Sequence, residues 1–116
     1  MKELGTYAEN TWCPGCGNFG ILRAVKKAAE LLDRSGFDLD TLVISSGIGC
    51  HGKIFDYLDL SGVYSLHGRA IATVSGMKMA NPALHPLAFV GAGDACLPSA
   101  ASSASRMACR ASSTDW

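Results

Sequence analysis

Two cysteines three residues apart are the first residues in the chain whose types and spacing could do chemistry. They lie in residues 11–18, which read Thr-Trp-Cys-Pro-Gly-Cys-Gly-Asn. Pro14 and Gly15 favour a tight turn that directs the sulfurs of Cys13 and Cys16 to one side. Thiolates in this arrangement bind soft metal centres or form a redox disulfide. Spacing alone leaves open an iron–sulfur cluster, a zinc site, and a pair that is incidental or weakly redox-active.

A third thiol, Cys50, lies in a glycine-rich stretch at residues 47–53, which reads Gly-Ile-Gly-Cys-His-Gly-Lys. A cubane iron–sulfur cluster takes four cysteines, commonly a close pair plus distant ones. Zinc also takes four ligands, and His51 beside Cys50 would complete a set of three cysteines and one histidine. Thioredoxin-like chemistry is disfavoured, because no strand is expected before the first two cysteines.

Three further groups of residues could bind an anion or a metal. Lys53 could meet a phosphate or a carboxylate, and residues 66–69 (Leu-His-Gly-Arg) place an imidazole and a guanidinium around a glycine. Asp94 ends the stretch Gly-Ala-Gly-Asp at residues 91–94, which suits Mg²⁺ bridging to a diphosphate. Taken singly, these groups are also explained as surface residues, helix caps or an Asx turn.

The elements expected to position these residues alternate between helix, strand and glycine-rich loop. Residues 1–10 are polar and unpatterned, which indicates an extended arm. The other expected elements are a helix at 19–32 with Asn18 as its N-cap and Gly36 as its stop, strands at 41–46, 62–66 and 87–90, and a helix at 69–79. Such alternation predicts an α/β fold with a mainly parallel sheet. Both glycine-rich loops follow strands, and ligands of open α/β sheets lie at the carboxyl ends of strands.

Composition narrows the class of protein. The chain has 116 residues, of which 48% are hydrophobic and 17% charged, so it can form a core of one modest domain or part of a larger one. Its formal net charge is zero and it has no run of Lys or Arg, so nucleic acid and membrane are poor guesses for partners. No apolar stretch resembles a signal or a membrane span, so we expect a cytoplasmic protein. Stable disulfides are rare there, and the five cysteines are then ligands, catalytic thiols or core residues.

The motifs together, and in this order, resemble the beta subunit of 2-oxoacid:ferredoxin oxidoreductases, the family of the pyruvate and 2-oxoglutarate synthases. The resemblance covers about residues 6–95. It implies a partial thiamin-diphosphate-binding α/β fold, with residues 1–96 as the N-terminal part of that domain. It also implies oxidative decarboxylation of a 2-oxoacid with coenzyme A, transfer of electrons to ferredoxin, and an alpha subunit as partner. The motifs that carry it lie at residues 12–18, 47–53, 66–69, 80–82 and 91–95.

The same resemblance implies roles for single residues. Cys13, Cys16 and Cys50 would be three ligands of a [4Fe–4S] cluster, and the fourth ligand in the family lies well beyond the end of this chain. Residues that would line the thiamin diphosphate are Ile48, Gly49, Cys50, His51 and His67.

The remaining implied roles concern the substrate and the metal. Lys53 falls near the reacting carbons and is the implied catalytic residue. Asp94 would bind Mg²⁺, with Ala95 and Cys96 near the diphosphate, although Ala95 replaces the second glycine of the family's Gly-Asp-Gly signature. A different register would put Ala92 at the metal position, and we prefer Asp94.

Residues 97–116 resemble nothing in the family and are mostly Ala and Ser. We expect an aberrant or disordered tail of a truncated or frame-slipped product, and an isolated chain that is unstable and inactive. The alternatives are a small zinc-binding module that uses Cys13, Cys16, Cys50 and His51, and a translated fragment without activity.

Overall fold

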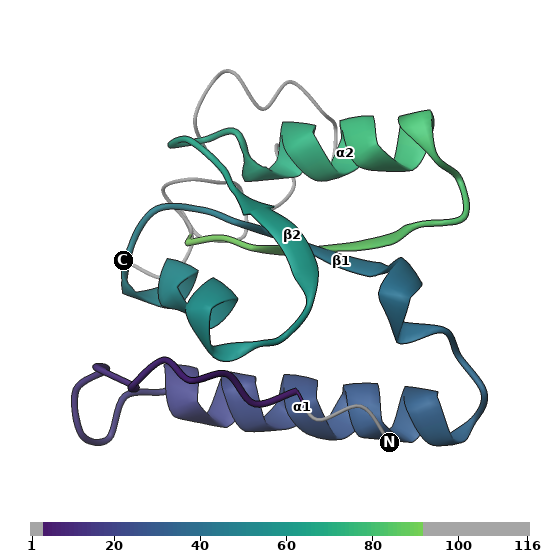
Figure 1. The fold of residues 1–116 in the computed structure, drawn as a ribbon. Coiled ribbons are helices and arrows are strands. Elements are labelled where there is room, and N and C mark those ends of the chain that lie inside the picture. The colour runs from purple at the N-terminus through teal and green to yellow at the C-terminus, as the bar shows by residue number, and fades with distance from the viewer. Residues whose placement is uncertain (1–3, 92–116) are drawn as a thin grey trace, which may run out of the picture.

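The structure, a computed structural model, describes residues 4–91. Its three strands form one parallel sheet in the order β2-β1-β3 (Figure 1), which confirms the predicted α/β class and the parallel sheet. The predicted roles of Asp94, Ala95 and Cys96 and the predicted boundary at residue 96 lie outside the described residues. The elements are α1 (Asn18–Arg34), η1 (Leu39–Thr41), β1 (Leu42–Ser46), η2 (Cys50–Tyr57), β2 (Ser61–Tyr64), α2 (Ala70–Ala80) and β3 (His85–Phe89), where η marks a 3₁₀ helix.

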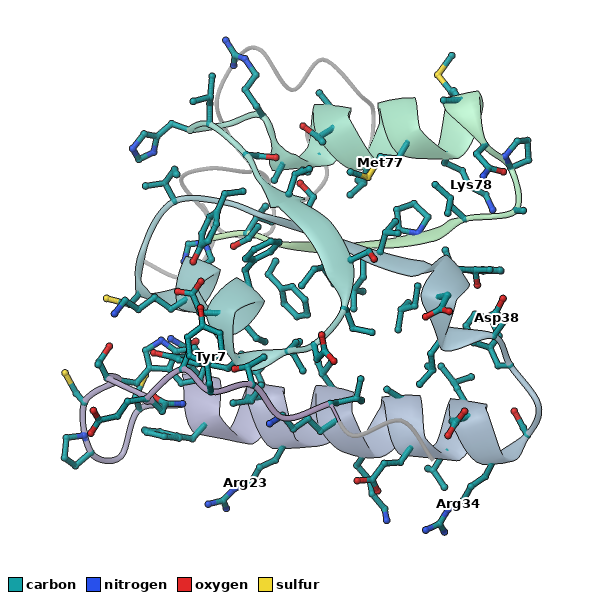
Figure 2. The ribbon with its side chains drawn as sticks, in the orientation of Figure 1. Tyr7, Arg23, Arg34, Asp38, Met77 and Lys78 are labelled. Atoms are coloured by element: carbon teal, nitrogen blue, oxygen red, sulfur yellow. The ribbon has the colours of Figure 1, made fainter. Side chains whose placement is uncertain are left out.

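Strand β1 is the centre of the sheet and has helices on both faces. Figure 1 shows α2 on one face, and η2 with α1 on the other. Ile44 of β1 is fully buried in the core on the α1 side, with Leu22 of α1 and Ile54 of η2. Because successive strand residues point to opposite faces, Ser45 faces α2 instead. In Figure 2, Met77 points from α2 toward the sheet.

Helix α1 begins one residue earlier than predicted, and Gly36 ends it as predicted. Gly17 is the N-cap and Asn18 the first helical residue, without a capping side-chain hydrogen bond, so the assignment of Asn18 as N-cap was wrong. Gly36 has a φ of +86°, and the Phe37 amide donates to the Leu32 carbonyl at 3.0 Å. This left-handed glycine and its hydrogen bond terminate the helix.

The N-terminal segment, predicted as an extended arm at residues 1–10, lacks regular structure over residues 4–12 and is part of the core. Leu4 is buried, and its carbonyl accepts a hydrogen bond from the Asp59 amide at 3.2 Å. The Thr6 hydroxyl donates to the Asp56 carbonyl. A single apolar residue has no periodicity, so the sequence pattern did not indicate the burial of Leu4.

The carboxyl ends of the three parallel strands meet at one edge of the sheet. The Gly47 amide donates to the Phe89 carbonyl at 2.8 Å, and the Ser65 amide donates to the Ser46 carbonyl at 2.8 Å. These contacts join the residue after β1 to the end of β3, and the residue after β2 to the end of β1. Among residues 4–91, neither α1 nor α2 has the length and apolar character that a membrane-spanning helix needs.

Candidate functional site

The predicted turn between the first two cysteines is present. The Cys16 amide donates to the Cys13 carbonyl at 3.0 Å, and Gly15 has a φ of +81°. Proline at the second position of a four-residue turn and a positive φ at the third are typical of a type II turn. Cys13 is exposed, Cys16 is half-buried, and both are free thiols. The turn leads directly into α1, because the Phe19 amide donates to the Cys16 carbonyl at 3.2 Å.

Trp12 joins this turn to the loop that carries Cys50. Its indole N–H donates to the Cys50 carbonyl. Its ring is buried, with edge-to-face contacts to Tyr57 at 4.9 Å and to Phe19 at 5.5 Å between ring centroids. The two cysteine-bearing segments, 34 or more residues apart in sequence, are therefore held together by one buried aromatic residue. Sequence reasoning gave Trp12 no role, although an aromatic residue directly before a pair of cysteines was the available signal.

The three predicted thiol ligands lie on these two adjoining segments. Cys50 is exposed and is a free thiol, like Cys13 and Cys16. Within residues 4–91, no three His, Cys, Asp or Glu side chains are arranged to hold a metal ion. Neither the three thiols of Cys13, Cys16 and Cys50 nor the zinc set that adds His51 is thus assembled as a metal site in the described part of the chain.

The loop after β1 has its shape fixed by a buried serine and by a close backbone approach. The buried Ser46 hydroxyl donates to the Gly52 carbonyl at 2.7 Å. A Cβ at Gly52 would overlap the Gly47 carbonyl oxygen, so only glycine fits there without a shift of the loop. The loop therefore closes on itself tightly and exposes Ile48, which is 40% exposed, at its tip.

The imidazole of His51 lies between the loops that follow β1 and β3. A Cβ at Gly49 would lie 2.8 Å from its Cε1 atom, and a Cβ at Gly91 would lie 3.2 Å from the same atom. Gly49 has a φ of +141°, which other residues rarely adopt. The glycines of both predicted loops thus make room for one ring, and that ring brings the two loops together.

The predicted residue Lys53 is exposed and is held by a residue from the other cysteine-bearing segment. Its ammonium donates to the Thr11 hydroxyl oxygen. The Thr11 amide donates to the hydroxyl of buried Tyr57 at 3.0 Å. Hydrogen bonds from the Thr11 side chain and amide lower the pKa of Tyr57 below its ordinary value of 10.0, and the charge of Lys53 lowers this pKa further.

His67 and Arg69 lie exposed on the turn that follows β2. The Arg69 amide donates to the Leu66 carbonyl at 3.0 Å, and Gly68 between the two side chains has a φ of +65°. Arg69 is also the N-cap of α2. The turn thus presents an imidazole and a guanidinium at the same edge of the sheet as His51.

A chain of hydroxyl groups that begins at the buried Ser45 supports this turn. Ser45 and Ser65 are hydrogen-bonded at 2.7 Å, and the Ser65 hydroxyl donates to the Thr73 hydroxyl at 3.1 Å. The Thr73 hydroxyl then donates to the Arg69 carbonyl at 2.9 Å. The chain connects β1, the end of β2 and α2, so the His67 turn is fixed to the centre of the sheet.

Comparison with known proteins shows close relatives of the chain. It is 52% identical over 87 residues to the 2-oxoacid:ferredoxin oxidoreductase subunit beta of Saccharolobus solfataricus, covering 73% of this chain and 28% of the relative. It is 48% identical over 95 residues to the 2-oxoacid:ferredoxin oxidoreductase 1, subunit beta, of Aeropyrum pernix, covering 81% of this chain and 29% of the relative. It is 44% identical over 84 residues to the 2-oxoglutarate synthase subunit KorB of Archaeoglobus fulgidus, covering 72% and 30%. No family model matches the chain.

The fold of the chain is also similar to that of a solved structure. The 2-oxoglutarate:ferredoxin oxidoreductase from Magnetococcus marinus, with 2-oxoglutarate, coenzyme A and succinyl-CoA bound, superposes with a TM-score of 0.70 at 37% identity. The match covers 78% of this chain and 30% of that one, so the chain spans under a third of the length of these four relatives. The fold and the identities agree: the chain belongs to the family of the beta subunits of 2-oxoacid:ferredoxin oxidoreductases.

Proposed function

We propose that this chain supplies part of the beta subunit of an enzyme that oxidatively decarboxylates a 2-oxoacid with coenzyme A and passes the electrons to ferredoxin. The observation that carries the proposal is the contact of Trp12 with the Cys50 carbonyl. It places the Cys13–Cys16 turn next to the glycine-rich loop at the carboxyl edge of a parallel sheet, where ligands of α/β folds bind. The names of the relatives supply the reaction class.

Three cysteines would hold a [4Fe–4S] cluster. Cys13, Cys16 and Cys50 are free thiols on segments that Trp12 joins, and thiolates are the donors that such a cluster takes. When bound, the cluster supplies one-electron transfer. The role of the chain's own residues is to keep the two segments together, so that a third thiol is available to the pair.

The loops at the carboxyl edge would bind thiamin diphosphate. Ile48, Gly49, Cys50 and His51 lie on the loop after β1, and His67 on the turn after β2. Glycines at 49 and 91 make room for the His51 ring, and Gly52 lets the loop close on the Gly47 carbonyl oxygen. Glycine-rich loops of this kind fit a cofactor bound through main-chain contacts. When bound, this cofactor supplies the carbon chemistry of decarboxylation. Asp94, with Ala95 and Cys96 near the diphosphate, would bind the Mg²⁺, a role that rests on the sequence motif.

Lys53 would act toward the substrate. Its exposed ammonium can pair with the carboxylate of a 2-oxoacid. The alpha subunit, ferredoxin and coenzyme A are the proposed partners, and the cytoplasm is the proposed compartment.

The test is to express a beta subunit of full length that contains this chain, together with an alpha subunit, and to purify the assembly without oxygen. We expect about four iron and four sulfide per beta chain, bound thiamin diphosphate that depends on Mg²⁺, and reduction of ferredoxin that requires coenzyme A and either pyruvate or 2-oxoglutarate. The variant Cys50→Ser should lose iron and sulfide, whereas the control Cys109→Ser should keep them. Zinc without sulfide would instead support the zinc-binding module, and no bound metal or cofactor would support the inactive fragment.

A further inference from the structure

We propose that Thr11 is a positioning residue for Lys53, and that Tyr57 holds Thr11 in the orientation that this role needs. The role goes beyond the site residues that the motifs indicate, and it deepens the proposed function, on which its catalytic meaning rests. Thr11 would not touch the reacting atoms. It would fix where the ammonium of Lys53 stands.

The contacts form a chain from the core outward. Tyr57 is buried, and its ring is fixed by the edge-to-face contact with Trp12. Its hydroxyl accepts a hydrogen bond from the Thr11 amide at 3.0 Å and lies 3.4 Å from the Thr11 hydroxyl oxygen. The Thr11 hydroxyl oxygen accepts a hydrogen bond from the ammonium of Lys53. The long, exposed lysine side chain is thus the outer end of a chain of contacts that begins in the core.

Residue chemistry explains why a threonine suits this position. A lysine side chain has a flexible stem of four carbons and loses rotamer entropy when it is fixed. Threonine is branched at Cβ and has few χ1 rotamers. With its amide bound to Tyr57, the Thr11 hydroxyl therefore occupies a defined place, and it gives the Lys53 ammonium a fixed acceptor.

The same contact joins the two cysteine-bearing segments a second time. Trp12 donates to the Cys50 carbonyl, and its neighbour Thr11 accepts from Lys53, three residues after Cys50. Two adjacent residues on one segment thus bind two nearby residues on the other. The orientation of Lys53 consequently depends on the correct folding of the Cys13–Cys16 turn.

The ionisation of Tyr57 offers a readout that needs no activity. Thr11 hydrogen bonds and the charge of Lys53 both lower the pKa of Tyr57. If Thr11 holds the ammonium near the phenol, then the effect of Lys53 on this pKa must depend on Thr11. A merely structural threonine would leave the effect of Lys53 unchanged.

The experiment measures the pKa of Tyr57 in the full chain, with or without its partner subunit, by NMR of ¹³Cζ-labelled tyrosine. The fully exposed Tyr7 serves as an internal reference. Lys53→Met should raise the pKa of Tyr57, and it should raise it by less than half as much in a Thr11→Val background. Thr11→Ser should restore most of the effect. Lys27→Met is the control, because Lys27 lies on α1 in an ion pair with Glu30 and should leave Tyr57 unchanged.

Two results would overturn the proposal: no shift of Tyr57 on Lys53→Met, or a shift of the same size with and without Thr11→Val. If Thr11→Val does not fold, the comparison of Thr11→Ser with Thr11→Ala takes its place. In the assembled enzyme, Thr11→Val should raise KM for the 2-oxoacid severalfold, with kcat changed less. An assembly that folds and shows the Tyr57 coupling without any activity on 2-oxoacids would refute the proposed function and leave the positioning of Lys53 intact.

Discussion

Trp12 makes both a polar and an apolar contribution to the junction of the two cysteine-bearing segments. The variant Trp12→Phe should keep most of the ring contacts with Phe19 and Tyr57 and lose the hydrogen bond to the Cys50 carbonyl. A single hydrogen bond contributes about 1 kcal/mol. We therefore expect the free energy of unfolding to fall by about this amount, measured by urea denaturation of the reduced chain.

A second variant at the same position separates the two contributions. Trp12→Leu removes the aromatic contacts as well, and loss of a large buried aromatic side chain costs about 3–5 kcal/mol when it is cut back to alanine. Trp12→Leu should accordingly be more destabilising than Trp12→Phe. Equal stability of Trp12→Phe and the unchanged chain would show that the indole N–H contributes nothing to the junction.

Tyr64 gives the chain a specific alkaline response. Partial burial and the nearby Asp56 carboxylate raise the pKa of Tyr64 to about 12, against an ordinary value of 10.0. Between these two values the unfolded chain has lost the phenolic proton and the folded chain keeps it. The folded state then binds more protons, so the free energy of unfolding decreases as the pH rises from 10 toward 12.

The measurement compares the unchanged chain with Tyr64→Phe. Urea denaturation at several pH values above 9 should show a smaller decrease in stability for Tyr64→Phe. In a pH titration followed by the absorbance of phenolate at 295 nm, the step at the highest pH should be missing in the same variant. Identical pH profiles for the two chains would contradict the assigned environment of Tyr64.

At the level of single residues, the sequence indicated the polar and thiol groups and missed their supports. Cys13, Cys50, His51 and Lys53 were predicted as site residues because the residue type alone shows what a thiol, an imidazole or an ammonium group can bind. Thr11 and Trp12 were not, because their roles arise from contacts with residues 38 or more positions away. Such contacts have no local pattern in the sequence.

Among the elements, the loop after β1 depends on glycine for steric reasons. A Cβ at Gly52 would overlap the Gly47 carbonyl oxygen and would lie 3.1 Å from the Ser46 hydroxyl oxygen. Gly52→Ala should therefore displace the loop, with a loss of about 1–3 kcal/mol, the usual cost of overpacking. Thermal unfolding followed by circular dichroism would measure this loss.

Gly76 provides the matched control for this substitution. It lies inside α2, and a Cβ there would meet nothing within 4 Å. Alanine in a helix interior is more stable than glycine by about 0.5–1 kcal/mol. Gly76→Ala should therefore stabilise the chain, opposite in sign to Gly52→Ala. Two substitutions with the same sign would show that the loop after β1 has room for a side chain.

Element types were predictable where the hydrophobic pattern was strong. The run of β-branched residues gave β1 to within one residue, and the apolar spacing of α1 gave a helix. The N-cap was wrong, since Gly17 rather than Asn18 takes that place. No element was predicted between residues 47 and 61, where the structure has η2. A 3₁₀ helix has a period between those of a strand and an α-helix, so it matches neither pattern.

For the molecule as a whole, the sequence predicted the class of fold and the structure corrected which surface of α1 is covered. The apolar residues that give the predicted helix its spacing include both Ile21 and Leu22. In the structure Leu22 and Ala29 are buried, while Ile21 is 50% exposed and Leu31 is 54% exposed. A helix with apolar residues on so much of its circumference has a second apolar face. The number of covered faces depends on neighbouring parts of the fold, which local periodicity does not record.

That second face predicts how the isolated chain behaves. Exposed apolar side chains promote association, and Ile21, Leu31 and Leu32 all lie on the one helix α1. We expect the isolated chain to self-associate and to bind a hydrophobic dye. The double variant Ile21→Glu, Leu31→Lys should reduce both, as measured by sedimentation velocity and dye fluorescence. Each new charge complements the helix dipole at its own end.

The stability of the variants decides whether the exposed face or the core is responsible. Because Ile21 and Leu31 are half-exposed, the double variant should change the free energy of unfolding by less than about 0.5 kcal/mol. The control Leu22→Glu places a carboxylate in the buried core and should unfold the chain. Self-association that persists in the folded double variant would mean that a surface other than α1, such as the exposed Leu66 and Met79, drives it. Loss of self-association in the folded double variant would show that the isolated chain associates through α1.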